Sequence, residues 1–329
     1  MDKILGIGNS LVDVLLKMED DSLLAELKLP KGSMQLIDEE MLTRIQHIQS
    51  AHVYHRSSGG SVANTICALG NLGMSPGFIG KVGEDEFGDF FRQTLQNQGV
   101  NTCLLTTSEH ASGIASTFIS PDGERTFGTY LGASGTLSAD DLSISMFEGY
   151  SYFYIEGYLP QNHALMLRAM QLAKEAGLQI CMDMASYNVV ESERGFFDML
   201  IDQYVDIVFA NESEARAYTG KEPAEALTEI GKKCSIAVVK TGKQGSMVKK
   251  GTEVVTVASL PVDHVVDTTG AGDFYAAGFL YGLTSGYSLE KCARISSVLA
   301  GYVIQVTGTD LSKEQWNEIK LNIEAILHP

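Results

Sequence analysis

Four short apolar runs follow one another in the middle of the sequence: YFYIEG (152–157), LQICMDM (178–184), DIVFAN (206–211) and SIAVVK (235–240). Each run has the length and the composition of a buried β-strand. Apolar residues at helical spacing occur between these runs, at 161–177 and 222–233. Strands that alternate with helices in this way predict a mostly parallel sheet covered on both faces, which is a three-layer α/β/α sandwich.

The same alternation continues toward both ends of the chain. ILGIG (4–8) has the composition of a buried strand, and helical spacing recurs at 288–305 and 311–327. In sheets of this kind, ligands bind outside the carboxyl ends of the strands. We therefore expect functional residues just after the apolar runs.

A second pattern occupies the N-terminal part of the chain, where four segments alternate like half-exposed strands. They are LVDVLLKM (11–18), SMQLID (33–38), GIASTFIS (113–120) and RTFGTYLG (125–132). We interpret them as a small β-sheet that forms a lid on one α/β domain spanning 1–329, because no repeat or linker divides the chain. The edge of such a sheet can pair with a second copy, so a monomer and a homodimer both remain open.

Composition narrows the class of protein. The 329 residues are 44% hydrophobic and 20% charged, as in ordinary soluble proteins, and no apolar stretch is long enough to span a membrane. The five cysteines include no C-x-x-C pair, and the N-terminus lacks a signal-peptide pattern, so we expect reduced thiols and a cytoplasmic location. The net charge of −17 argues against nucleic acid and anionic membranes as partners.

The most informative polar segment is DTTGAGD (267–273), which follows the strand-like VDHVV and precedes a helical pattern rich in Ala and Gly. Gly270 and Gly272 allow backbone N–H groups to converge at a helix N-terminus, where anions bind. Asp273 can then accept a proton from a hydroxyl that lies beside a bound phosphate, as a general base. The alternative is a glycine turn that only caps a helix, which suits a lone G-x-G-D better than this longer segment.

A second glycine segment is SGGSVAN (58–64), which leads into another helical pattern. Gly59 and Gly60 permit close approach of a ligand to the backbone, and Asn64 offers both donors and acceptors. An ordinary loop–helix junction is the alternative for this segment taken alone.

Together, the two glycine segments resemble the ribokinase, or PfkB-type, family of carbohydrate and nucleoside kinases, and the resemblance extends over essentially the whole chain. It implies a ribokinase-like fold and transfer of a phosphoryl group from ATP to a hydroxyl. It also implies that Asp273 is the catalytic base, that Gly270, Ala271 and Gly272 form an anion hole, and that Gly59, Gly60 and Asn64 contact the acceptor.

The segment GNSLVD (8–13) follows the first apolar run. A carboxylate such as Asp13 can accept hydrogen bonds from vicinal hydroxyls of a ribose or a similar polyol. The resemblance assigns Asp13 to the acceptor, and the Asn9–Asp13 spacing is similar to that of adenosine kinases. The alternatives are a turn residue at Asn9 and a solvated charge at Asp13.

Two further segments resemble the nucleotide-binding elements of the family. Asn211 and Glu214 match an Asn-x-x-Glu element that holds Mg²⁺, largely through water; one amide and one carboxylate suffice for this ion, although the pair also fits a capping box. Gly242 and Gly245 match a nucleotide loop, and Lys240 stands where many members have threonine. Lys240 could pair with phosphate or simply end a strand.

Arg125 and Glu156 are the remaining site candidates. Arg125 lies on the expected lid, from which a cation could reach a phosphoryl group, and adenosine kinase-like members place an arginine similarly. Glu156 matches in rough position a sugar-contacting glutamate of the family. A hairpin arginine and a strand-end charge are the alternatives.

The resulting hypothesis is a kinase that uses ATP and Mg²⁺ and phosphorylates a primary hydroxyl of a nucleoside, with adenosine favoured. A kinase for ribose, fructose or 2-keto-3-deoxygluconate is the first alternative, and a non-catalytic nucleotide or sugar sensor is the second. The resemblance also allows K⁺ near Asp267. The sequence contains no G-x-x-x-x-G-K-[ST] segment, which disfavours a P-loop kinase.

Overall fold

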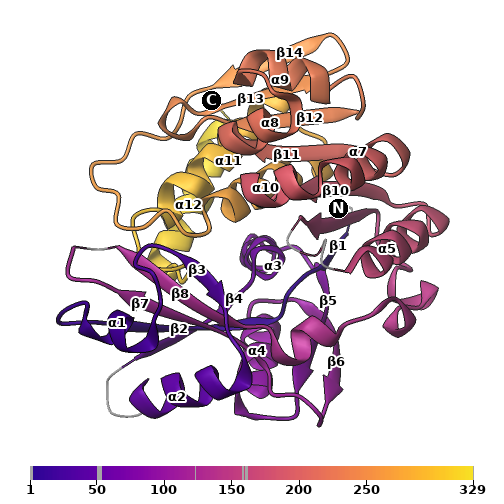
Figure 1. Cartoon of the computed structure of the whole chain (residues 1–329). Coiled ribbons are helices and arrows are strands. Elements are labelled where there is room, and N and C mark those ends of the chain that lie inside the picture. Colours follow the sequence, from indigo (N-terminus) through magenta and orange to yellow (C-terminus); the bar gives the residue numbers. More distant parts are fainter. Residues whose placement is uncertain (1–2, 50–53, 123, 158, 160–161, 329) are drawn as a thin grey trace.

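The structure is a computed structural model, and it describes residues 3–49, 54–122, 124–157, 159 and 162–328. Figure 1 shows a large sheet with helices packed on it and a separate group of strands at the lower left that carries α1 and α2. None of the helices in these ranges is long and apolar enough to cross a membrane.

The large sheet has nine strands within the described residues, and seven of them are parallel to their neighbours. The last two strands form an antiparallel hairpin at one edge. In spatial order the strands are β14 (Glu253–Val257), β13 (Ser246–Lys250), β12 (Ile236–Lys240), β11 (Ile207–Asn211), β10 (Gln179–Asp183), β9 (Tyr152–Glu156), β1 (Ile4–Ile7), β5 (Gly77–Gly83) and β6 (Asn101–Thr107).

Side chains on alternate positions of each strand enter two different cores. In β9, Tyr152 and Tyr154 pack in one core, whereas Phe153 and Ile155 pack in the other. The first core is covered by α3 (Ser61–Asn71), α4 (Glu86–Asn97), α10 (Ala271–Thr284), α11 (Leu289–Val303) and α12 (Lys313–Leu327). The second is covered by α5 (His163–Glu175), α6 (Tyr187–Ser192), α7 (Arg194–Gln203), α8 (Glu212–Thr219) and α9 (Pro223–Ile230).

The position of α3 depends on a glycine in the first strand. A Cβ atom on Gly6 would lie 2.5 Å from Cγ1 of Val62 and 2.7 Å from Cγ1 of Ile66. Both distances are far below van der Waals contact, so only glycine lets this helix lie so close to β1. This contact fixes the N-terminus of α3 at the carboxyl end of β1, where Asn9 and Asp13 follow.

The small sheet has five described strands and a core of its own. In spatial order they are β3 (Met34–Leu36), β8 (Arg125–Tyr130), β7 (Gly113–Ile119), β2 (Leu11–Lys17) and β4 (His55–Gly59). Leu16 and Phe118 pack with Leu24 and Leu27 of α1 (Ser22–Leu27) and with Ile45 of α2 (Glu39–Gln49). Short 3₁₀ turns complete the described chain: η1 (Gly132–Thr136), η2 (Ala139–Asp141), η3 (Ile144–Met146) and η5 (Gly242–Gln244).

The structure confirms the α/β fold class, with its large mostly parallel sheet and its second small sheet. The five apolar runs are β1, β9, β10, β11 and β12, and the four expected helices are α5, α9, α11 and α12. The segments expected for the small sheet contain β2, β3, β7 and β8.

One expected strand is wrong. The segment VDHVV (262–266) belongs to an irregular stretch, 258–268, and Val265 and Val266 are 57% and 58% exposed. Two of its valines, Val262 and Val265, instead line a pocket that is described below. Conversely, β4 and β5 were not anticipated, because β4 (HRSSG) has no large apolar residue and β5 (GFIGKVG) contains three glycines.

Candidate active site

Asp273 lies in the first turn of α10, immediately after a left-handed turn. The helix begins at Ala271, and Gly270 before it has φ of 75°, a conformation that favours glycine. The hydroxyl of Ser61 donates to Oδ1 of Asp273 at 2.6 Å, and Nδ2 of Asn64 donates to Oδ2 at 2.9 Å. The N-termini of α3 and α10 therefore meet at this carboxylate.

The surroundings of Asp273 set its proton affinity. Burial raises the pKa of Asp273 to about 6, while the hydrogen bonds from Ser61 and Asn64 act in the opposite direction. Desolvation disfavours the charged form, and donors that bind the carboxylate favour it. A carboxylate with this pKa is ionised at neutral pH and is a stronger base than an ordinary aspartate, which suits it to accept a proton from a hydroxyl.

Glu156 lies beneath this junction and not on its surface. Its Oε2 accepts from the backbone N–H of Val62 at 3.0 Å, and its Oε1 accepts from the backbone and side-chain nitrogens of Asn9, both at 3.1 Å. The side chain is 1% exposed. Because both oxygens accept hydrogen bonds from the chain, this geometry supports a role in holding Asn9 and α3 in place, and the contact of Glu156 to a sugar stays a prediction.

Asp13 points from β2 of the small sheet toward the same junction. Its strand neighbours are Ser57 of β4 and Ala115 of β7, and a Cβ atom on Gly59 would collide with its carboxylate. Burial, followed by the charge of Asp310, raises the pKa of Asp13 to about 7. Within the described residues no donor is hydrogen-bonded to the Asp13 carboxylate, so its oxygens are available to hydroxyls of a ligand.

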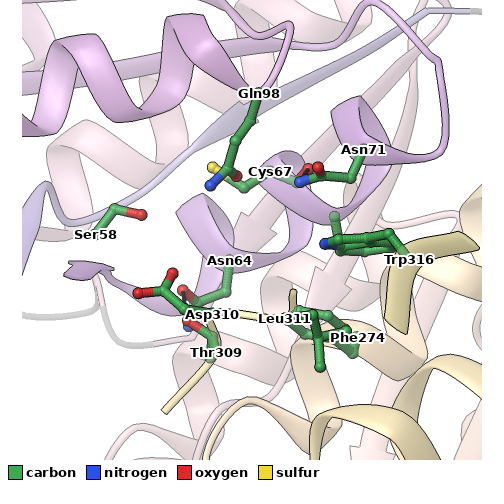
Figure 2. A pocket seen from close by; sticks show the side chains of 11 residues that line it. Ser58, Asn64, Cys67, Asn71, Gln98, Phe274, Thr309, Asp310, Leu311 and Trp316 are labelled. Atoms are coloured by element: carbon green, nitrogen blue, oxygen red, sulfur yellow. Dashed lines mark hydrogen bonds between the residues drawn. The ribbon is translucent and has the colours of Figure 1, made fainter. Parts of the chain in front are cut away.

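Asp310 was not anticipated from the sequence. Figure 2 shows its carboxylate beside Asn64, Thr309 and Ser58, at the rim of a pocket of about 70 Å³. The hydroxyl of Thr309 donates to Oδ1 of Asn64 at 3.4 Å, so the amide of Asn64 is held from two sides. The pocket has room for only a few water molecules.

Arg125 reaches from β8 of the small sheet to the segment that precedes α10. Its Nη2 lies 2.6 Å from Oδ2 of Asp267, and its Nη1 donates to the hydroxyl of Thr269 at 3.1 Å. The side chains of Arg125 and Asp267 are only 15% and 4% exposed. The small sheet thus contacts the glycine turn through this arginine, as a lid that covers the site would.

A pocket of about 770 Å³ lies on the other side of the glycine turn. Gly242, Gly245 and Lys240 line one wall, and Ala271 and Gly272 of the turn line another. The sequence had not pointed to the remaining wall, which is mostly apolar: Leu260, Pro261, Val262, Val265, Ala300, Gly301 and Ile304. Pockets of this size with apolar walls and a few polar groups are typical of small-molecule sites.

Asn211 and Glu214 form a capping box at the start of α8. The backbone N–H and Nδ2 of Asn211 donate to the two carboxylate oxygens of Glu214 at 2.7 Å and 2.6 Å. Asn211 lines the pocket, whereas Glu214 is 2% exposed. Both carboxylate oxygens of Glu214 thus accept hydrogen bonds from Asn211, as in a structural cap, and the described residues contain no cluster of three or more His, Cys, Asp or Glu that could hold a metal ion.

The tertiary structure thus brings most of the anticipated residues to one cleft. Asn64 donates to Asp273, Arg125 contacts Asp267 and Thr269 just before the 270–272 turn, and the charges of Asp273 and Arg125 reach Asp13 of the small sheet. The residues to which sequence reasoning gave no role are Ser61, Thr269, Asp310 and Asp183, whose Oδ2 lies 2.7 Å from Nζ of Lys240. Asp183 ends a predicted strand, so the rule for parallel sheets could have found it. Asp310 is in a loop without a local pattern.

The comparisons with known proteins agree with this geometry. A family model described as pfkB family carbohydrate kinase matches residues 34–316. A probable sugar kinase from Rhizobium etli has a TM-score of 0.87 at 33% identity, covering 99% of each chain. The adenosine kinase from Sinorhizobium meliloti has a TM-score of 0.85 at 35% identity, covering 97% of this chain and 99% of that one.

An uncharacterized sugar kinase from Archaeoglobus fulgidus is 31% identical over 244 residues, which are 73% of this chain and 95% of the relative. The chain therefore belongs to the PfkB family of carbohydrate kinases and is an ATP-dependent kinase. Kinases of this family generally use ATP and Mg²⁺.

Proposed function

We propose that this kinase transfers the γ-phosphoryl group of ATP to a primary hydroxyl of a nucleoside, with adenosine as the favoured acceptor. The observation that carries the proposal is the position of Asp273. Its carboxylate is held by Ser61 and Asn64 in the first turn of α10, and the residues just before it, Ala271 and Gly272, line the nucleotide pocket. A base and a phosphate site therefore share one turn.

The proposed chemistry follows from this arrangement. Asp273 takes the proton of the acceptor hydroxyl, and the hydroxyl oxygen attacks the γ-phosphorus as the bond to the ADP oxygen breaks. The backbone N–H groups of residues 270–272, together with the helix N-terminus, stabilise the negative charge on the transferred group. Bound Mg²⁺ would contribute charge neutralisation of the phosphates. Arg125 and the small sheet would exclude water, which otherwise competes as an acceptor.

The negative charge of the aspartates around the proposed acceptor site favours an acceptor without a charge of its own. Asp13, Asp310 and Asp273 are close enough for the charges of the other two to raise the pKa of Asp13. A sugar acid such as 2-keto-3-deoxygluconate would bring another carboxylate into this field, and like charges repel. Adenosine, ribose and fructose carry no such charge. The Asn9–Asp13 spacing and the 35% identity to an adenosine kinase favour adenosine among these.

A coupled assay of ADP release tests the proposal, with adenosine, ribose, fructose and 2-keto-3-deoxygluconate as acceptors. Adenosine should give the highest kcat/KM and the sugar acid the lowest. Asp273→Asn should lower kcat by about 10²–10⁴-fold and leave acceptor binding intact, because only the proton acceptor is lost. Turnover near that of the wild type in this variant would reject the role of Asp273.

The same assay separates the alternatives. Higher kcat/KM for ribose or fructose than for adenosine would identify a sugar kinase. Ligand-induced shifts in Tm without ADP release for any acceptor would identify a sensor. Replacing K⁺ with tetramethylammonium tests the requirement for K⁺ near Asp267.

A further inference from the structure

We propose that Lys240 is a catalytic cation that contacts the transferring phosphoryl group at the 270–272 turn, and that Asp183 positions its ammonium group. The proposal rests on the proposed function, because it concerns the same phosphate site. It adds a second source of positive charge beside the backbone N–H groups and assigns a role to a buried aspartate.

The position of the ammonium group comes first. Lys240 is the last residue of β12 and lines the nucleotide pocket. A Cβ atom built on Gly272 would lie 3.1 Å from Nζ of Lys240, so the ammonium group lies beside the backbone of the glycine turn. A side chain at position 272 would separate the two. The ammonium group therefore lies on the side of Gly272 from which a side chain would project, next to the turn whose backbone N–H groups form the proposed phosphate site.

Asp183 holds Lys240 in that place. Its Oδ2 lies 2.7 Å from Nζ of Lys240, and the side chains are 7% and 14% exposed. The other oxygen, Oδ1, accepts from the backbone N–H of Ala185 at 2.9 Å. Ala185 has φ of 66°, a left-handed conformation that is unfavourable for alanine. The chain thus adopts a strained turn at the residue that orients the Asp183 carboxylate, and such strain is often found at functional sites.

The ion pair has no clear structural purpose. Desolvation of both charges offsets most of the Coulomb attraction, so a buried pair is weak evidence for added stability. The ammonium group also retains donors, since Asp183 is the only hydrogen-bond partner of Nζ among the described residues and an ammonium has three N–H bonds. The remaining donors are available to phosphate oxygens.

Lys240 is charged when the nucleotide binds. Burial by itself disfavours the ammonium, but the carboxylates of Asp183 and Glu214 outweigh it and raise the pKa of Lys240 to about 12. Lys240 and Lys243 are the two cationic side chains that line this pocket among the described residues, and Lys240 is the one beside the 270–272 turn. A fixed ammonium in a buried site is worth more than an exposed one, because water does not screen it.

In the reaction, the bond between the γ-phosphorus and the ADP oxygen breaks, and a bond to the acceptor oxygen forms. The hydroxyl proton moves to Asp273, and Lys240 keeps its protons throughout. Charge shifts onto the oxygens of the transferred group and of ADP in the transition state. A cation held in place by Asp183 therefore stabilises the transition state more than it stabilises bound ADP.

The test compares ADP with ADP–aluminium fluoride, an analogue of the transferring phosphoryl group, by calorimetry in the presence of Mg²⁺. Lys240→Met should weaken binding of the analogue by about 100-fold and binding of ADP by less than about threefold, with a matching loss of kcat. Lys249→Met is the control, because Lys249 lies on the neighbouring strand β13 and, among the described residues, its Nζ donates only to the exposed carbonyl of Gly251. It should change neither affinity. Equal weakening of ADP and the analogue in Lys240→Met would overturn the proposal.

Asp183→Asn tests the positioning role separately. It should weaken binding of the analogue by about tenfold in the wild-type background and have no further effect in a Lys240→Met background, because residues that act through one another are not additive. An equal effect in both backgrounds would overturn the role of Asp183. Lys240→Thr provides a small polar variant if the methionine variant does not fold. The binding comparison between ADP and the analogue involves no acceptor. The role of Lys240 can therefore be rejected while nucleoside phosphorylation is confirmed, and it can be confirmed while nucleoside phosphorylation is rejected.

Discussion

At the scale of single residues, the site depends on carboxylates whose surroundings differ. Asp273 accepts hydrogen bonds from Ser61 and Asn64, Asp13 has no hydrogen-bond donor among the described residues, and Glu156 is fully bonded and buried. The same chemical group is therefore suited to a base, to hydroxyl binding and to structural support.

The pH dependence of turnover should report Asp273. A base must be ionised to act, and the pKa of Asp273 is raised to about 6. Asp13, whose pKa is raised to about 7, must also be ionised to accept hydrogen bonds from the acceptor. We therefore expect kcat/KM to rise as pH increases through about 6 to 7 and to level off above that range. Ser61→Ala removes a donor that lowers the pKa of Asp273, so the midpoint should move to higher pH. Measurement of kcat/KM between pH 5 and about 8 checks both statements; an unchanged midpoint in Ser61→Ala would contradict the assignment.

Glu156→Ala tests whether Glu156 stabilises the fold by accepting hydrogen bonds from Asn9 and Val62. The substitution leaves the N–H groups of Asn9 and Val62 buried without an acceptor, which should lower the free energy of unfolding by about 2–4 kcal/mol. Urea unfolding measures the loss, with Glu148→Ala as an exposed control that should change little. A variant with unchanged stability and a raised KM for the acceptor would instead show that Glu156 contacts the ligand.

At the scale of elements, two helix N-termini and one irregular segment build the cleft. The starts of α3 and α10 converge on Asp273, and the stretch 258–268 and α11 both line the pocket of about 770 Å³. Leu260 packs so closely on α11 that a Cβ atom on Gly301 would lie 2.7 Å from its Cδ2. The apolar wall is thus made by contact between a loop and a helix that are well separated in sequence.

A larger side chain on this apolar wall should weaken binding of ATP without affecting Asp273, the proposed general base. Ala300→Phe places a large ring where a small side chain lines the pocket. We expect KM for ATP to rise about tenfold or more, which corresponds to about 1.4 kcal/mol of lost binding, with KM for the acceptor unchanged. Steady-state kinetics with each substrate varied in turn measures the two constants. Ala325→Phe on α12, outside this pocket, is the control; unaltered KM for ATP in Ala300→Phe would argue that the nucleotide binds elsewhere.

At the scale of the whole molecule, the small sheet and the large sheet meet over the site. Figure 1 shows the strands β2, β7 and β8 in a group apart from the large sheet, and Arg125 connects this group to Asp267. Asp13 comes from the same small sheet. Movement of the small sheet would thus change acceptor binding and the cover over the phosphate site together, which is the expected behaviour of a lid.

Arg125→Met should loosen the connection between the small sheet and the segment that precedes α10. It removes the contacts to Asp267 and Thr269, so kcat should fall by about 100-fold and exchange of backbone amide protons in β7 and β8 should become faster. Lys31→Met is the control, because Lys31 pairs with Asp21 and Asp122 on the exposed part of the small sheet. Slower turnover without faster exchange would mean that Arg125 acts on the phosphoryl group and does not hold the lid.

The sequence by itself determined the fold class, because the apolar runs and helical spacing between 152 and 240 are local properties that survive without tertiary information. It also singled out Asp273 and its glycine turn. Only the tertiary structure decided the partners of that aspartate, since Ser61 and Asn64 are 212 and 209 positions away in the sequence. It also decided that Arg125 of the small sheet contacts Asp267 and Thr269 just before the turn. Long-range contacts leave no periodic trace in a sequence. For the same reason, VDHVV had the composition of a strand, but it faces a pocket and has no strand partner among the described residues.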